Sequence, residues 1–199
     1  PFFSTIFKVR ACFLMHYGLT KRLKLRYLVK QDWSFFFDLH SSVEVNRYVR
    51  TPETAEQIAN KFNRCCLPWQ FESGEWLALL IEEIDSGLPV GITGLRAISD
   101  ELAQAEVGYL LSPLMQGKGY ATESLRFVLD YCFKILKLHK VTALTDINNL
   151  ASANVLIKTG FIKEGLLRDN NQIDQQWHDD YFWGLIEHEY QAQYILAIK

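Results

Sequence analysis

The sequence lacks the features that mark membrane-spanning and nucleic-acid-binding proteins. Its 199 residues contain no apolar run that approaches the roughly 20 residues needed to cross a bilayer. It also lacks an excess of basic charge, because 21 Lys and Arg stand against 23 Asp and Glu, for a formal net charge of -2. Non-specific binding to DNA needs a strongly basic surface. We therefore expect no membrane and no DNA among the partners.

The chain is also poor in cysteine motifs. Its cysteines are Cys12, Cys65, Cys66 and Cys132, and no pair has the CxxC or CxH spacing of a metal site. Cys132 falls on the apolar face of an expected helix, where a cysteine packs as a small core residue. This cysteine usage favours a reducing, cytoplasmic compartment, and we expect no metal cofactor.

No repeat, low-complexity tract or Gly/Ser-rich linker divides the chain. With 49% hydrophobic and 22% charged residues, it can bury one substantial core, so we expect a single domain over residues 19–199. Residues 1–18 are interpreted as an N-terminal extension. Their apolar residues are interrupted by Lys8 and Arg10, and no small-residue cleavage site follows, unlike a targeting segment. Since Met15 offers an internal start, the sequence leaves open whether residues 1–14 are native.

Hydrophobic periodicity predicts a mixed α/β (α+β) fold. Apolar-polar alternation and short apolar runs predict strands at 23–29, 75–85, 89–99, 103–112, 140–147, 161–169 and 180–190. Helical spacing predicts helices at 30–42, from 52 onward, at 121–138 and at 151–160. This order of elements predicts a central, mostly antiparallel sheet of about seven strands with helices on both faces.

Two of these helices have well-defined sequence features. Thr51 followed by Pro52 predicts an N-cap and a first helical residue. In the helix at 121–138, one apolar face is expected to be buried. It consists of Leu125, Val128, Leu129, Cys132, Ile135 and Leu136.

The stretch Gln116-Gly117-Lys118-Gly119-Tyr120-Ala121 lies between an expected strand and an expected helix. Its two glycines allow positive φ, and the start of the helix offers free N–H groups to an anion such as phosphate. By itself, however, a GxG turn is more often only a turn. A nucleotide-binding P-loop is excluded because Gly119, not Ser or Thr, follows Lys118. The dinucleotide fingerprint is excluded because Thr122 stands where it needs glycine or alanine.

With its neighbours, this stretch resembles the pyrophosphate-binding motif of the GNAT superfamily of N-acetyltransferases, and in particular the branch of ribosomal-protein alanine N-acetyltransferases. The resemblance continues through AEVGYLLSP, ATESLRFVLDYCF, INNLASANVLIKTGFIKEGLLRD and HDDYFWGLIEHEY, and so covers nearly everything from Leu19 onward. It implies a GNAT-like sheet that splays open between the strands at 105–112 and 140–147. It also implies acetyl-coenzyme A as co-substrate and no metal.

The resemblance assigns cofactor contacts by position. The expected cofactor-binding residues are Leu110, Leu111, Gln116, Gly117, Lys118, Gly119, Tyr120, Ala121, Thr122, Asn149 and Ser152. A backbone N–H in a bulged strand, here residues 108–112 with Gly108 suited to the bulge, would hold the thioester carbonyl. Asn149 would bind the pantetheine arm and Ser152 the departing sulfur, although both residue types also suit helix capping. No tyrosine stands at the position that donates to the thiolate in other branches.

The resemblance also assigns the catalytic step. Acetyl transfer needs a deprotonated amine, and Glu106, on the strand before the glycine loop, is the expected catalytic base. The branch's late glutamate is missing from Leu167-Arg168-Asp169-Asn170-Asn171, so Asp169 and Asp179 are weaker alternatives.

The acceptor is the least determined part of the expected site. A protein N-terminus is favoured, and a small-molecule amine remains an alternative, as does a catalytically weak coenzyme A-binding regulatory module. Candidates for lining the acceptor site are Tyr48, Arg50, Trp69, Phe71, Trp177 and His178. The sequence leaves a monomer and a homodimer equally open.

Overall fold

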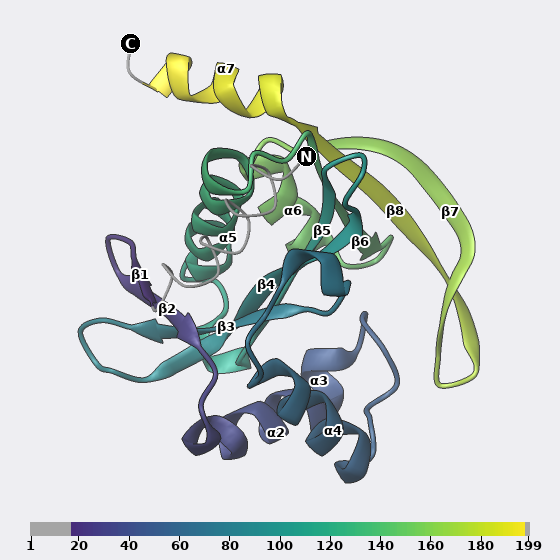
Figure 1. The fold of residues 1–199 in the computed structure, drawn as a ribbon. Coiled ribbons are helices and arrows are strands. Elements are labelled where there is room, and N and C mark those ends of the chain that lie inside the picture. The colour runs from purple at the N-terminus through teal and green to yellow at the C-terminus, as the bar shows by residue number, and fades with distance from the viewer. Residues whose placement is uncertain (1–16, 198–199) are drawn as a thin grey trace.

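One sheet of eight strands organises the protein, for which a computed structural model describes residues 17–197 (Figure 1). The strands are β1 (Tyr17–Leu19), β2 (Leu23–Tyr27), β3 (Leu77–Glu83), β4 (Pro89–Ser99), β5 (Gln104–Leu111), β6 (Lys140–Asp146), β7 (Ile162–Ile173) and β8 (Gln176–Ile186). They are ordered β1-β2-β3-β4-β5-β6-β8-β7. Residues 1–16, which make up most of the expected N-terminal extension, lie outside the described residues.

The sheet is antiparallel except at one junction. β5 and β6 run parallel, and they pair only through Gln104–Glu106 and Lys140–Thr142. On its other side β5 stays paired with β4 as far as Leu111. β5 and β6 therefore diverge after Glu106, and this confirms the mixed, mostly antiparallel sheet and the expected splay.

Helices cover both faces of the sheet. On one face lie α2 (Trp33–Ser41), α3 (Val43–Asn46) and α4 (Ala55–Cys65), preceded by the 3-10 turn η1 (Lys30–Asp32). On the other lie α5 (Tyr120–Asp130), the π-helical turn η4 (Tyr131–Ile135) and α6 (Leu150–Lys158). The remaining elements are the 3-10 turns η2 (Phe71–Ser73) and η3 (Pro113–Met115) and the helix α7 (Glu187–Ala197). No helix within residues 17–197 is long and apolar enough to span a bilayer.

Strand alternation divides the core between the two faces. Ala78 and Leu80 of β3 pack with Phe36 and Ile58 under α2 and α4. Their neighbours on β3 face the larger core beneath α5, which also contains Leu125 and the fully buried Cys132. Burial raises the pKa of the Cys132 thiol, consistent with the expected core role.

Several predicted boundaries are wrong at the edges of the sheet. β1 was not expected, and the predicted strand at 180–190 ends at Ile186, where α7 begins. β7 and β8 are longer than their apolar residues suggest and form the long hairpin at the right of Figure 1. The polar residues near its tip show no alternation of their own, and they are extended because Asn171 pairs with His178 across the hairpin.

Two predicted helix details are also wrong. α4 is capped by Thr54, not Thr51, because Thr54 and Gln57 form a capping box, and Thr51 instead accepts a hydrogen bond from the N–H of Asp174. Ile135 is 55% exposed although the other residues of its expected face are buried. The cause is the π turn, in which Leu136 donates to Tyr131, five residues earlier, and shifts the helical register.

Candidate active site

A cavity of about 830 Å³ occupies the gap between the diverging strands. Its walls come from both faces of the sheet: residues of α2, α3 and α4 line one end, and the glycine loop and α6 line the other. Val107 to Leu111 of β5 and Ala143 to Asp146 of β6 line it where the strands separate. Because β5 lacks a pairing partner on this side after Glu106, alternate backbone N–H and C=O groups there are available to a ligand.

Strand register places Glu106 and Tyr109 on opposite sides of the sheet. Glu106 pairs with Arg96 of β4 and with Thr142 of β6 and faces the α2–α4 side. Tyr109 is three residues further along β5, so its side chain faces α6. The cavity therefore has a carboxylate on one side of the sheet and a phenol on the other.

The glycine loop has the backbone conformation that an anion cradle requires. Gly117 and Gly119 have φ of +74° and +81°, and a Cβ atom at Gly117 would have open space around it. Gly119 is the N-cap of α5, so the first N–H groups of this 11-residue helix have no partner within the helix. The helix dipole adds positive potential at the same point.

Arg22, which precedes β2, fixes the loop against α5. Its NH1 donates to the carbonyl of Lys118 at 3.0 Å, and its Nε donates to Glu123 at 2.7 Å. The guanidinium also lies 4.7 Å from the centre of the Tyr120 ring. The Tyr120 ring is buried in the core, and its hydroxyl donates to Glu83. No sequence motif indicated the role of Arg22, which depends on a contact across about a hundred residues of chain.

Tyr109 and Ser152 form a hydroxyl pair at the α6 side of the cavity. Their hydroxyl oxygens are 2.8 Å apart, and Tyr109 also donates to the Ser152 carbonyl at 3.2 Å. Burial raises the pKa of Tyr109 to about 12, so it stays protonated at neutral pH. Asn149 caps α6 by accepting the N–H of Ser152 at 3.1 Å. No tyrosine stands at the expected motif position, but β5 brings Tyr109, 43 residues away in the sequence, next to Ser152.

Glu106 is held by an ion pair. Its Oε2 accepts from the Nε and NH2 atoms of Arg96 at 3.0 and 2.7 Å, and its side chain is 16% exposed. Trp76 lies beside this pair, with its ring 5.3 Å from the Arg96 guanidinium. No register shift falls at Gly108, so the expected bulge there is wrong. Gly108 instead makes room for Trp76, whose ring would lie 3.1 Å from a Cβ atom.

Two further carboxylates line the cavity on β6 and β8. Asp146 and Asp180 are directly paired, so their side chains share the face on which Glu106 lies. Asp146 is bound to His178 Nδ1 at 2.5 Å, and Asp180 accepts from Asn170 at 2.8 Å. Burial raises the pKa of Asp180, and the neighbouring Asp146 charge adds to this. Neither carboxylate was expected at the site, because each lies within a predicted strand and no sequence motif distinguishes it from an ordinary strand residue.

The cavity gathers nearly all the residues expected at the cofactor site. The following residues line it: Glu106, Leu110, Leu111, Gln116, Gly117, Gly119, Tyr120, Ala121, Thr122, Asn149 and Ser152. Lys118 does not, and its Nζ lies 3.5 Å from the Met115 sulfur. Asp169 and Asp179, the alternative bases, are not among the lining residues and lie together on the hairpin, where Asp179 accepts the N–H of Asp169.

The acceptor-site candidates divide into two groups. Tyr48 and Arg50 line the cavity, as expected. Trp69 and Phe71 are buried in the main core, where the Trp69 indole donates to the Glu75 carbonyl. Trp177 is 62% exposed on β8, away from the cavity lining, and His178 is bound to Asp146. Within residues 17–197, no three His, Cys, Asp or Glu side chains are grouped closely enough to hold a metal ion.

Comparison with known proteins identifies the family to which the chain belongs. The acetyltransferase (GNAT) domain family matches residues 22–162. The chain belongs to the GNAT family of acetyltransferases. The "Uncharacterized N-acetyltransferase p20" of Bacillus licheniformis is 31% identical, over 86% of this chain and 96% of its own length. The "Putative ribosomal N-acetyltransferase YdaF" of Bacillus subtilis is 26% identical, over 81% of this chain and 80% of its own length.

A solved structure supports the GNAT fold. Spermidine N-acetyltransferase from Vibrio cholerae, in complex with coenzyme A and spermine, superposes with a TM-score of 0.75 at 24% identity, covering 86% of this chain and 99% of that one. The chain is thus an acetyl-coenzyme A-dependent N-acetyltransferase with the α+β GNAT fold.

Replacing Gly119 should weaken cofactor binding. In Gly119→Asp, a Cβ atom at φ +81° is strained, and the carboxylate opposes an anionic pyrophosphate. We expect the acetyl-coenzyme A dissociation constant, measured by isothermal titration, to rise at least about tenfold, the effect of losing one charge-assisted contact. Gly74→Asp is the control, because Gly74 has φ +68° but lies outside the cavity lining. Equal acetyl-coenzyme A affinities for the two variants would contradict a pyrophosphate-binding role for the glycine loop.

Proposed function

We propose that the protein transfers the acetyl group of acetyl-coenzyme A to a primary amine, the N-terminal amine of a protein, by direct attack of the amine on the thioester. The observation that carries this proposal is the placement of Glu106 and the Tyr109–Ser152 pair on opposite sides of the sheet, at the point where β5 and β6 separate. The similarity to YdaF, which is named a "Putative ribosomal N-acetyltransferase", supports a protein as the acceptor.

The cofactor would bind along the α5–α6 side of the cavity. The pyrophosphate would rest on the N–H groups that follow Gly119, with Gly117 allowing close approach. The pantetheine arm would run beside Leu110 and Leu111, where β5 has unpaired backbone groups, and past Asn149. This places the thioester in the gap between β5 and β6. A backbone N–H of β5 would then hold the carbonyl oxygen as negative charge develops on it.

Glu106 would receive the proton of the attacking amine, directly or through water. An α-amino group has a pKa near 7.7 to 8.0, so a fraction is already deprotonated at neutral pH, and a base on the acceptor side raises the usable fraction. Both Arg96 contacts go to Oε2 of Glu106, and the ion pair holds the carboxylate at the cavity wall. Asp146 and Asp180 would hold the ammonium form as it enters.

Tyr109 and Ser152 would stabilise the departing thiolate. As the C–S bond breaks, the electron pair stays on sulfur, and a hydroxyl donor at that point lowers the barrier. Tyr109 is suited to donate because its raised pKa keeps the phenol protonated, and its single proton would turn from the Ser152 carbonyl to the sulfur. Its 2.8 Å contact with Ser152 brings a second hydroxyl to the same place.

The proposal is tested with a peptide acceptor and the variant Glu106→Gln. The wild-type protein should release coenzyme A thiol with peptides that have a free N-terminus and not with the same peptides N-terminally blocked. Glu106→Gln should lower kcat about 100-fold, the lower end for loss of a general base, because Gln cannot take the proton. Its acetyl-coenzyme A affinity should be unchanged because Glu106 lies on the opposite side of the sheet from the loop.

Asp179→Asn is the matched control for this variant. Asp179 lies on the hairpin outside the cavity lining, so the same loss of one carboxylate should leave kcat unchanged. Wild-type turnover by Glu106→Gln across pH would remove Glu106 from the base role. Acetyl-coenzyme A binding without thiol release from any amine would favour a regulatory module instead.

Tyr109→Phe tests the thiolate donor. We expect kcat to fall roughly 10- to 100-fold, the value of one hydrogen bond to a charged group, with little change in acetyl-coenzyme A affinity. In the wild type, the rate should rise as the amine deprotonates and stay level to pH 10, since the pKa of Tyr109 is about 12. A falling rate between pH 8 and 10, or an unchanged kcat in Tyr109→Phe, would contradict this role.

A further inference from the structure

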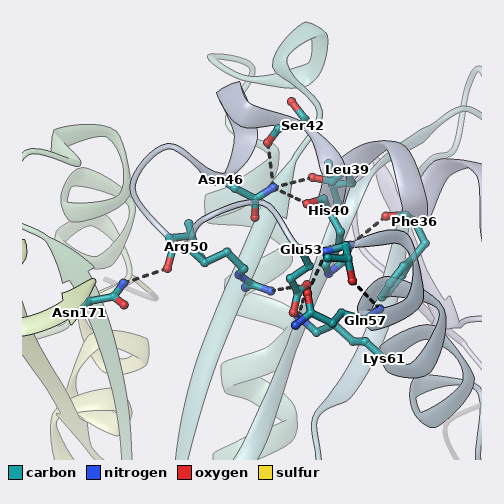
Figure 2. Close-up of polar contacts among 12 residues, drawn as sticks. Phe36, Leu39, His40, Ser42, Asn46, Arg50, Glu53, Gln57, Lys61 and Asn171 are labelled. Atoms are coloured by element: carbon teal, nitrogen blue, oxygen red, sulfur yellow. Dashed lines mark hydrogen bonds and ion pairs between the residues drawn. The ribbon is translucent and has the colours of Figure 1, made fainter. Parts of the chain in front are cut away.

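The end of the cavity under the helical face carries three basic side chains. Arg50 follows α3, while Lys61 and Arg64 come from α4, and all three line the cavity. Figure 2 shows Arg50 and Lys61 converging on Glu53. These cations lie on the side of the sheet from which an acceptor amine would approach Glu106.

The cations here outnumber their carboxylate partners. Glu53 binds Lys61 Nζ through both oxygens, at 2.6 and 2.5 Å, and it is itself not part of the cavity lining. Arg50 reaches the same carboxylate only at 3.5 Å, and Glu53 is its one charged partner within the described part of the chain. Arg50 is 32% and Lys61 24% exposed. One carboxylate therefore serves two partly buried cations, and the guanidinium of Arg50 has donors to spare.

The neutral state of His40 is consistent with this positive field. His40 lines the cavity beside the cluster, and its pKa is lowered to about 4, first by burial and also by the charges of Lys61 and Arg50. His40 thus adds no positive charge at neutral pH. At the outer edge, Arg64 faces Glu75 at 3.6 Å, with both side chains more than half exposed, so this pair contributes little.

Arg50 is held in place from both sides by the hairpin. Asn171 of β7, labelled in Figure 2, donates to the Val49 carbonyl at 3.0 Å, and the Asp174 N–H donates to the Thr51 hydroxyl at 2.7 Å. The residues on either side of Arg50, Val49 through its carbonyl and Thr51 through its hydroxyl, are therefore anchored to a distant part of the chain. A cation positioned in this way needs less reorganisation to bind a ligand.

The opposite charge lies on the sheet, where the amine has to react. Glu106, Asp146 and Asp180 share the face that looks toward α2–α4, and all three line the cavity. The acceptor end thus has carboxylates near the reacting centre, with Glu106 paired to Arg96 and Asp146 to His178, and cations under the helices. A ligand with an amine at one end and an anion at the other matches both walls, whereas a polyamine matches only one.

We propose that the acceptor is a primary amine that also carries a carboxylate, with the amine at Glu106 and the carboxylate at Arg50. This inference rests on the acetyl transfer of the proposed function and specifies the chemistry of its acceptor. Two sources share the chemistry: a protein N-terminus with an acidic residue at its second position, and a free amino acid. Polyamines are disfavoured because their additional ammonium groups would face Arg50 and Lys61.

Matched acceptors test this class. Thiol release is measured with amidated peptides that begin Ala-Asp or Ala-Asn, with alanine and alaninamide, and with spermidine. We expect kcat/KM for at least one acid to exceed that of its matched amide about tenfold, the value of one charge-assisted hydrogen bond. The peptide pair and the amino-acid pair distinguish the two sources. Spermidine should have a lower kcat/KM than the preferred acid.

Arg50→Gln should abolish the preference for the acid by lowering the rate with the acid to that of the matched amide, while the acetyl-coenzyme A affinity stays unchanged. Arg168→Gln is the control: Arg168 is exposed on β7, outside the cavity lining, so this variant should keep the preference.

Three results would overturn the inference. Equal rates for acids and amides, or spermidine as the best acceptor, would do so while leaving the acetyl transfer of the proposed function intact. An acid preference that survives in Arg50→Gln would remove Arg50 from the site. If acetyl-coenzyme A does not bind, or if none of the acceptors causes thiol release, the proposed function and the inference are contradicted together.

Discussion

The separation of β5 from β6 after Glu106 is the constraint on which the rest of the site depends. β5 and β6 pair in parallel through three residue pairs, and beyond these β5 remains paired only with β4. The gap connects the two faces of the sheet, so a cofactor on the α5–α6 side and an acceptor on the α2–α4 side can meet. Since successive side chains of β5 alternate between faces, one strand supplies both Glu106 and Tyr109.

Much of the fold and of the cofactor site was predictable because it depends on local sequence. β4 was predicted with its observed bounds. α6 was located to within a residue or two, because its N-cap Asn149 and the Gly160 that follows its last turn can be recognised in the sequence. The glycine loop was located by its glycines, and the observed positive φ at both shows why those residues are needed.

The parts that were missed depend on contacts between distant segments. Arg22 meets Glu123, and Tyr109 meets Ser152, through the folded sheet alone. The acceptor end combines residues of α4, β6 and β8 with Arg50, which the hairpin anchors through Val49 and Thr51. Its charge pattern therefore could not be seen along the sequence, where Asp146, Asp180 and Lys61 look like ordinary surface residues.

A crystal structure of the protein with coenzyme A tests the central claim most directly. The gap between β5 and β6 should hold the pantetheine arm, with the pyrophosphate on the N–H groups that follow Gly119. The sulfur should lie within about 3.5 Å of the Tyr109 or Ser152 hydroxyl, allowing for the longer hydrogen bonds of sulfur. A coenzyme A molecule bound elsewhere, or a sulfur that points away from both hydroxyls, would contradict the account.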